Sequence, residues 1–295
     1  MDKITTHLWF DKEAIEAAKL YTSIFNDSKI TNTSIIRNTP SGDCDIVSFT
    51  LAGQSFMAIS AGPFFKFNPS ISFHVACKTK DEVDSLWKKL SEGGTILMEL
   101  GKYPFSEKYG WLQDKFGLSW QIIYVGDKMP KQKITPAMMF VGKVAGKAEE
   151  AIKFYSTVFR NSKINNILHY GKGEALDKEG TVKYASFALE GKEFGAMDSA
   201  YEHKFAFNEA ISFIVHCDTQ KEIDYYWGKL SAVPESEQCG WLKDKFGVSW
   251  QIVPTVMNEM MKTKDEKKIV RVTEAFLKMK KFDIETLKRA YEGKK

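Results

Sequence analysis

Long apolar runs are missing from this sequence, and so are the short motifs of several enzyme classes. No stretch of about eighteen apolar residues occurs, which excludes a transmembrane helix of ordinary length. No GxSxG or HExxH motif is present, so the corresponding hydrolases and metalloproteases are not indicated. No glycine-rich loop follows an expected strand, which argues against a dinucleotide-binding domain.

Cysteine is scarce and lacks the spacing of a metal ribbon or a disulfide scaffold. The four residues are Cys44, Cys77, Cys217 and Cys239, and no CxxC pair occurs among them. The first residues also lack a basic segment followed by an apolar stretch and a small-residue cleavage site, so we expect no secretory signal. A reducing cytoplasm is the expected location.

Excess charge of one sign is confined to the last part of the chain. The net charge is +4, yet residues 262–295 alone hold twelve Lys/Arg and six Asp/Glu, a net of +6 that leaves −2 for the rest. The main body therefore offers no basic face for nucleic acid, and we expect neither a nucleic-acid nor a membrane partner.

What the sequence does contain is a duplication. Residues 110–122 read GWLQDKFGLSWQI and residues 240–252 read GWLKDKFGVSWQI, with eleven of thirteen positions identical. LYTSIFNDSKI (20–30) returns as FYSTVFRNSKI (154–164), and FKFNPSISF (65–73) as FAFNEAISF (205–213). These echoes predict one copy at 1–125, a linker at 126–132, a second copy at 133–256 and a basic helical tail at 257–295.

Within each copy, strand and helix periodicities alternate. ITTHLWF alternates at period two, the next segment has a helical apolar stripe, and three strand-like runs follow. The pattern restarts at ISFHVAC, with a helix beginning at Thr79 and ending at Gly93–Gly94. Each copy thus predicts βαβββ followed by βαβββ, in the α+β class. In the tail, Asp265 opens a stretch of helical spacing and Asp283 caps a second short helix.

This order, with the residues FKFN, SISF, GW and DKFG-x-SWQI, resembles the vicinal oxygen chelate superfamily of glyoxalase, bleomycin-resistance and extradiol-dioxygenase proteins. Its PhnB-like branch, in tandem form, is the most similar. The resemblance implies two glyoxalase-like domains, each of paired βαβββ modules with a curved, largely antiparallel sheet around a cavity. It also implies that the two copies complete each other's sheets as an intramolecular pseudo-dimer, beside which a homodimer stays open. Many members carry the name 3-demethylubiquinone-9 3-methyltransferase, which no residue here supports.

The resemblance also implies where a metal would bind, and this chain departs from that pattern. In metal-binding relatives a glutamate on the last strand is a ligand, and the corresponding residues here are Gln121 and Gln251. A neutral amide is a poorer ligand for a divalent cation than a carboxylate. In copy one the remaining candidates are His7 and His74. Their counterparts in copy two, Ala137 and Ile214, bind no ion.

Other candidate ligand-binding residues follow from the same alignment. A two-residue shift would place the second ligand position at Ser72 and Ser212, and His216 shares a strand face with Ser212. Flat apolar walls suit a small organic ligand. The candidate ligand-binding residues are His7, Trp9, Ser72, His74, Gln121, Met139, Ser212, His216 and Gln251.

We therefore expect a PhnB-like protein that binds a small organic molecule in an aromatic-lined cavity, with Gln121 and Gln251 as polar anchors and no tightly bound metal or other cofactor. The alternative is a glyoxalase/lyase-like or dioxygenase-like enzyme in which His7, His74 and Gln121 hold a divalent ion in copy one. Divergence between the copies predicts two unequal pockets, or one working pocket and one scaffold.

Overall fold

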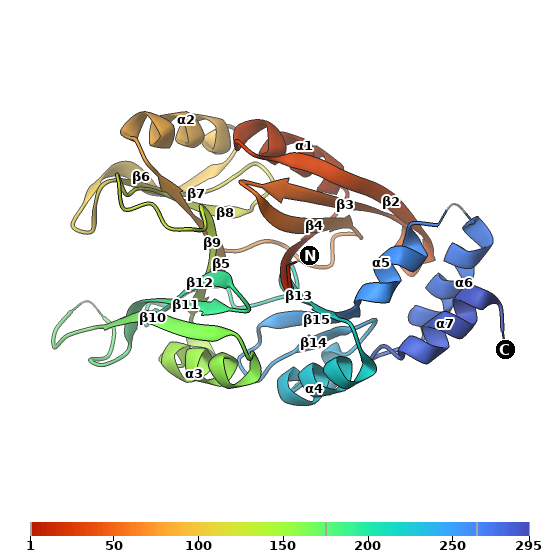
Figure 1. Cartoon of the computed structure of the whole chain (residues 1–295). Helices are drawn as coiled ribbons and strands as arrows, with labels where there is room; N and C mark the ends of the chain where they lie inside the picture. The colour runs from red at the N-terminus through yellow and green to blue at the C-terminus, as the bar shows by residue number, and fades with distance from the viewer. Residues whose placement is uncertain (1, 175, 264, 295) are drawn as a thin grey trace.

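The computed structural model describes residues 2–174, 176–263 and 265–294. The chain forms four strand-and-helix modules and a helical tail (Figure 1). Module one contains β1 (Ile4–Phe10), α1 (Ala14–Ile24), β2 (Lys29–Thr39), β3 (Gly42–Leu51) and β4 (Gln54–Ser60). Module two contains β5 (Ile71–Cys77), α2 (Lys80–Ser91), β6 (Thr95–Tyr103), β7 (Ser106–Gln113) and β8 (Ser119–Tyr124).

The second repeat supplies modules three and four. Module three contains β9 (Ile134–Phe140), the 3-10 turn η1 (Gly142–Val144), α3 (Ala148–Val158), β10 (Ser162–His169), β11 (Val182–Leu189) and β12 (Lys192–Asp198). Module four contains β13 (Ile211–Cys217), α4 (Gln220–Leu230), the 3-10 turn η2 (Pro234–Ser236), β14 (Trp241–Lys243) and β15 (Ser249–Pro254). The tail holds α5 (Thr255–Met261), α6 (Glu266–Phe276) and α7 (Ile284–Glu292). No helix in the described ranges combines the length and apolarity needed to cross a membrane.

The sheets form between repeats. A seven-stranded sheet, in the order β14-β15-β13-β1-β4-β3-β2, joins module four to module one. An eight-stranded sheet, β10-β11-β12-β9-β5-β8-β7-β6, joins module three to module two. Antiparallel pairs close both junctions, with His7 opposite Ser212 and Ser72 opposite Ala137. The predicted α+β class, tandem glyoxalase-like fold and helical tail are confirmed.

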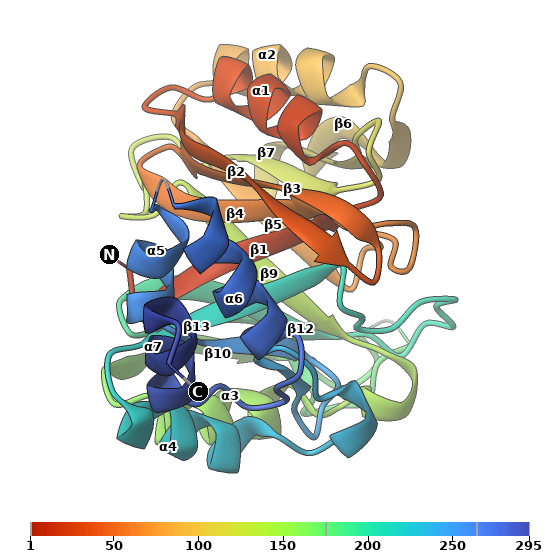
Figure 2. The ribbon, with the colours of Figure 1, turned by 90° about the vertical axis from the view of Figure 1, so that its right-hand side faces the viewer.

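The helices lie outside the two sheets. Figures 1 and 2 place α1 and α2 at one end of the molecule and α3 and α4 at the other. Local sequence accounts for their starts: the Thr79 hydroxyl accepts a hydrogen bond from Glu82 N over 3.1 Å, and Thr219 does the same for Glu222 N over 3.2 Å. The expected helix start at Thr79 agrees with α2.

The duplicated GW segments are built around a buried carboxylate. Asp114 Oδ2 accepts from Tyr21 Oη (2.7 Å) and Trp120 Nε1 (2.8 Å), and its Oδ1 accepts from two amides of the hairpin turn. Asp244 repeats the arrangement with Tyr155 and Trp250. Burial raises the pKa of both carboxyls, and the donated hydrogen bonds act against that rise. The motif therefore ties each hairpin to the first helix of its own repeat.

Module four departs from the predicted βαβββ pattern. Between α4 and β15 the described chain holds η2 and the short strand β14, where module two holds β6 and β7. The expectation of three strands after this helix was wrong, because the connection before Gly240 is too short for a full hairpin.

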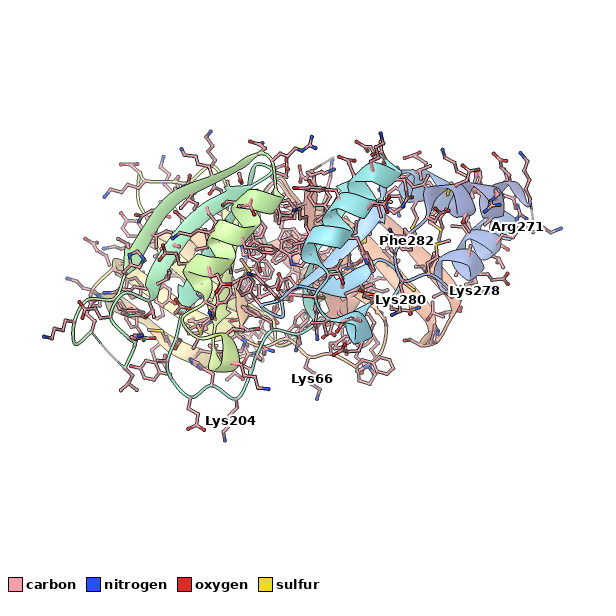
Figure 3. The ribbon with its side chains drawn as sticks, turned by 90° about the horizontal axis from the view of Figure 1, so that it is seen from below. Lys66, Lys204, Arg271, Lys278, Lys280 and Phe282 are labelled. Carbon is pink, nitrogen blue, oxygen red and sulfur yellow. The ribbon has the colours of Figure 1, made fainter. Side chains whose placement is uncertain are left out.

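The tail takes the place of the missing strand. In module two, Tyr109 pairs with Gly101 of β6. In module four, Cys239 N donates to Met279 O over 2.8 Å, and Gly240 N donates to Lys280 O over 2.7 Å. Figure 3 shows Lys280 and Phe282 beside α4, and Gln220 Nε2 of that helix donates to Phe282 O over 3.1 Å. The tail is thus an integral part of the seven-stranded half.

Candidate ligand cavity

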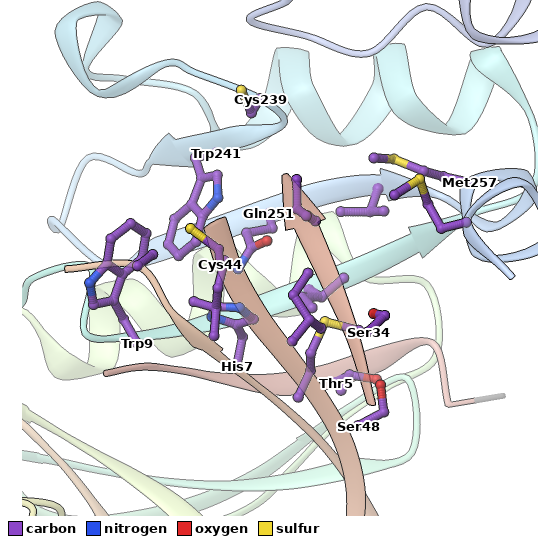
Figure 4. A pocket seen from close by; sticks show the side chains of 18 of the residues that line it. Thr5, His7, Trp9, Ser34, Cys44, Ser48, Cys239, Trp241, Gln251 and Met257 are labelled. Atoms are coloured by element: carbon purple, nitrogen blue, oxygen red, sulfur yellow. The ribbon is translucent and has the colours of Figure 1, made fainter. Parts of the chain in front are cut away.

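A cavity of about 820 Å³ lies on one face of the seven-stranded sheet (Figure 4). Its walls come from β1 to β4 of the first repeat and from β13 to β15 of the second. Tail residues, among them Met257, Met261 and Phe276, complete the enclosure. Both repeats and the tail are therefore needed to form this single space.

Aromatic rings meet at right angles in one corner of the cavity. The Trp241 ring lies 5.3 Å from that of His7 and 5.9 Å from that of Trp9, with interplanar angles of 88° and 75°. The Phe65 ring lies 5.1 Å from Trp9 at 81°. Trp9 Nε1 donates to Gly62 O over 2.8 Å, which fixes that indole. Edge-to-face contacts of this kind make stiff apolar walls.

The polar groups of the cavity floor come from strands of different repeats. Gln251 Nε2 donates to Ser212 Oγ over 3.0 Å. Thr5 Oγ1 and His216 Nε2 are 3.0 Å apart and share a hydrogen bond. His7 Nδ1 is buried and has no hydrogen-bond partner among the described residues. The floor thus presents an amide and an imidazole beside the aromatic corner.

Both cavity histidines are neutral at pH 7. Burial lowers the pKa of His7 to about 3, and burial is also the main reason that the pKa of His216 falls to about 4. A charged imidazole in this setting would lose its hydration without a counter-ion. The inner wall therefore carries no positive charge from these two side chains.

The eight-stranded sheet fills the corresponding space with tyrosine. Tyr109 Oη donates to Gln121 Oε1 over 2.6 Å, and Gln121 Nε2 donates to Ser72 Oγ over 2.7 Å. The Tyr184 ring stacks on His74 with centroids 5.7 Å apart. In the repeat alignment, Tyr109 and Tyr184 correspond to Cys239 and Ile46, both of which line the cavity. Two smaller side chains thus leave room in one sheet that tyrosines occupy in the other.

The structure divides the predicted ligand residues between the two sheets. His7, Trp9, Ser212, His216 and Gln251 belong to the seven-stranded sheet, and all but Ser212 line the cavity. Ser72, His74, Gln121 and Met139 belong to the eight-stranded sheet.

This division corrects the metal set predicted from copy one. His74 and Gln121 are register partners on β5 and β8, whereas His7 lies on β1 of the other sheet. The three side chains come from one repeat but not from one site, because the repeats exchange modules. A metal bound by all three is not compatible with this arrangement.

The donors that do lie together fit a divalent cation poorly. His7, Ser212 and Gln251 offer one imidazole, one hydroxyl that already accepts from the amide, and one neutral amide. His216 is four strand residues beyond Ser212, which is about 13 Å along the sheet. No cluster of three His, Cys, Asp or Glu side chains suited to a metal occurs within the described ranges. A site of this chemistry lacks the charge that hard cations require.

Sequence reasoning missed three contributors to the cavity: Ile46, Trp241 and the tail. Ile46 could have been found from the sequence, because its repeat counterpart is the much larger Tyr184 and the size difference indicates extra space beside Ile46. Trp241 could not have been found in this way. The matching Trp111 is also preceded by glycine and followed by leucine, yet its Nε1 donates to Ser119 Oγ over 2.8 Å. Trp241 instead faces His7 and Trp9.

Comparison with known proteins places the chain in a family. A family model described as 3-demethylubiquinone-9 3-methyltransferase matches residues 2–123 and again residues 132–253. The chain belongs to this family. The name labels the family model and does not by itself assign methyl transfer to this member.

Two solved structures are similar in sequence to part of the chain. A PhnB protein from Bacillus cereus, described as a 3-demethylubiquinone-9 3-methyltransferase, is 44% identical and covers 42% of this chain and 99% of its own, with a TM-score of 0.40. A protein from Staphylococcus aureus is 38% identical and covers 42% of this chain and 98% of its own, with a TM-score of 0.18.

The fold is shared over both repeats with a more distant protein. A mutant of glyoxalase I from Zea mays covers 88% of this chain and 97% of its own, with a TM-score of 0.54 and 15% identity. This likeness shows the tandem fold of the family member and nothing of its chemistry. The search of curated proteins returned no match.

Proposed function

We propose that this family member binds one small organic molecule in the cavity of its seven-stranded sheet. The observation that carries the proposal is the cavity itself, about 820 Å³ in volume and walled by Trp9, Trp241 and Phe65. Clefts of this size with aromatic walls and few polar groups are the usual form of a small-molecule site. The eight-stranded sheet serves as the scaffold, because Tyr109 and Tyr184 occupy its corresponding space.

Gln251 is the polar anchor of the proposed site. Its amide nitrogen is held by Ser212, so its carbonyl oxygen is left for a ligand. Gln121, the anchor expected in the other half, already accepts from Tyr109. The proposal therefore assigns ligand binding to one of the two repeated glutamines.

The proposed binding uses no tightly held metal. Neutral oxygens and a single imidazole around Ser212 support this part of the proposal. A cytoplasmic location belongs to the same proposal and is supported by the four cysteines being free thiols.

Binding of N-phenyl-1-naphthylamine, an uncharged dye that brightens in apolar surroundings, tests the proposal. We expect saturable binding of one dye per chain. Ile46→Tyr installs the side chain that the other sheet carries at this position and should weaken binding at least tenfold. Tyr184→Phe, in the eight-stranded sheet, is the matched control and should bind like the wild type.

Melting temperatures establish that both variants are folded. Unsaturable dye binding, or equal affinity for the wild type and a folded Ile46→Tyr variant, would overturn the proposed function.

A further inference from the structure

The eight-stranded sheet contains an internal example of what the cavity is built to hold. Tyr109 is 5% exposed, and its ring packs against Tyr103 and Phe105. Its hydroxyl donates to Gln121 Oε1 over 2.6 Å. A phenol is thus bound between aromatic rings and a buried glutamine, and the phenol belongs to the protein.

The seven-stranded sheet repeats the glutamine–serine pair of this site without the tyrosine. Gln251 stands where Gln121 stands, and Ser212 holds its amide nitrogen as Ser72 holds that of Gln121. Cys239 corresponds to Tyr109 in the repeat alignment and lines the cavity, although its φ is +50° and it lies outside the strand. Gln251 Oε1 has no hydrogen-bond partner in the part of the chain that the structure describes. The glutamine–serine pair is thus the same in both sheets, and in this sheet the glutamine oxygen is left for a ligand in the cavity.

The orientation of the amide selects a donor. Because the Gln251 nitrogen donates to Ser212 Oγ, the carbonyl oxygen is the atom directed to the cavity. A ligand that brings an O–H or N–H satisfies this oxygen, whereas a ligand without one leaves it buried and unpaired. Trp241 is the direct register partner of Gln251, so the anchored group lies next to an aromatic face.

Three charged residues line the cavity, and of these Glu209 and Lys262 are paired while Glu235 adds a negative charge. Glu209 forms an ion pair with Lys243 at 2.8 Å, and Lys262 forms one with Glu259 at 2.9 Å. Near Gln251 the wall consists of Ile214, Trp241 and His7. An anionic group placed there would lose water without gaining a cation, which is costly.

We propose that the ligand is an uncharged molecule with a hydroxyl-bearing aromatic ring, whose O–H donates to Gln251 Oε1 in the position that Tyr109 takes in the other sheet. The inference rests on the proposed small-molecule function and names the class of ligand. The ring lies against Trp241, and the hydroxyl replaces the missing tyrosine hydroxyl.

Calorimetric titration with 2-naphthol and with naphthalene tests the inference, since the two probes differ only in the hydroxyl. We expect 2-naphthol to bind at least tenfold more tightly, the difference that one hydrogen bond to a buried acceptor makes. Gln251→Met should remove that preference and leave naphthalene binding unchanged. Gln121→Met, the matched change in the other sheet, should keep it.

The anchoring role of Gln251 has its own decisive outcome. A folded Gln251→Met protein that keeps the wild-type preference for 2-naphthol over naphthalene would overturn the inference.

The outcomes separate the ligand class from the general function. Equal affinity for the two probes overturns the hydroxyl-bearing class and leaves the small-molecule function standing. If neither probe binds, the hydroxyl-bearing class is also overturned. Binding of the naphthylamine dye then shows independently whether the cavity binds any organic molecule.

Discussion

Trp111 Nε1 donates a hydrogen bond of 2.8 Å to Ser119 Oγ, whereas the matching Ser249 Oγ is buried without a partner among the described residues. The same eight-residue spacing from tryptophan through the turn to serine thus has two side-chain arrangements in one molecule. The difference arises because Trp241 contacts His7 and Trp9 in the cavity.

Replacing each serine by alanine should have unequal effects. Ser119→Ala leaves the Trp111 indole without its acceptor and should lower the free energy of unfolding by about 1 kcal/mol. Ser249→Ala removes an unpaired buried hydroxyl and should change it by less than about 0.5 kcal/mol, or stabilise the protein. Urea unfolding measures both, and equal losses would contradict the two arrangements.

The buried carboxylates should be equally important in both repeats. In each repeat a tyrosine and a tryptophan donate to the Oδ2 atom of the aspartate. In Asp114→Asn and Asp244→Asn these two donors face either the amide NH₂ group, which cannot accept, or the amide oxygen, which is a weaker acceptor than a carboxylate. Each change should cost about 3 kcal/mol of unfolding free energy, because buried donors to a charged group lose their partner. Thermal unfolding compares them, and a cost below about 1 kcal/mol at either site would argue against an anchoring role.

Gly240 should be intolerant of a side chain for two separable reasons. Its φ is +83°, and a Cβ would lie 2.5 Å from Phe282 Cε2. Gly240→Ala should therefore cost at least ~2 kcal/mol and loosen the tail. Hydrogen exchange at α7 reads out the loosening. In a Phe282→Ala background the clash with Phe282 is gone, while the backbone strain and a 3.0 Å approach to Ile252 O persist, so the added cost of Gly240→Ala should be smaller but not zero.

Stability should fall in mild acid because of buried neutral histidines. Burial lowers the pKa of His7 to about 3 and that of His74 to about 4, while the unfolded value is about 6.5. Between those values the unfolded chain binds more protons, so stability is complete above pH ~6.5 and declines as the pH falls. Each such histidine contributes a slope of up to ~1.4 kcal/mol per pH unit. His7→Met should reduce the slope of unfolding free energy against pH by the amount that corresponds to about one bound proton. Denaturant unfolding from pH 4.5 to 7.5 measures this slope, and an unchanged slope would contradict the prediction.

Metal loading should fail to give a stoichiometric complex. Protein purified without a histidine tag and incubated with zinc, nickel, manganese or iron should retain well under one ion per chain by elemental analysis after dialysis. The reason is the uncharged donor set of His7, Ser212 and Gln251. One bound equivalent that disappears in His7→Ala would show that the cavity binds metal, and one that disappears only in His74→Ala would place the ion in the other sheet.

Local features could be predicted from the sequence because they depend on residues a few positions apart. The duplication, the helix start after Thr79 and the tail helices capped by Asp265 and Asp283 are of this kind. The α+β class and the family resemblance follow from the order of such elements along the chain.

The pairing of modules depended on tertiary structure. β1 pairs with β13 and β5 pairs with β9 through the same backbone hydrogen bonds that pairing within one copy would use. Two copies with the same order of strands offer two similar partners, so strand periodicity alone does not choose between them. That choice separated His7 from His74 and Gln121, and brought it to Gln251.

The sequence by itself therefore determined two repeated sets of strands, helices and turns, since hydrogen bonding and periodicity act locally. Tertiary structure alone decided which sheet would contain a cavity, because empty volume depends on side chains that meet across strands. Tyr109 and Tyr184 fill the space on one sheet, whereas Cys239, Ile46 and the tail leave a cavity of about 820 Å³ on the other.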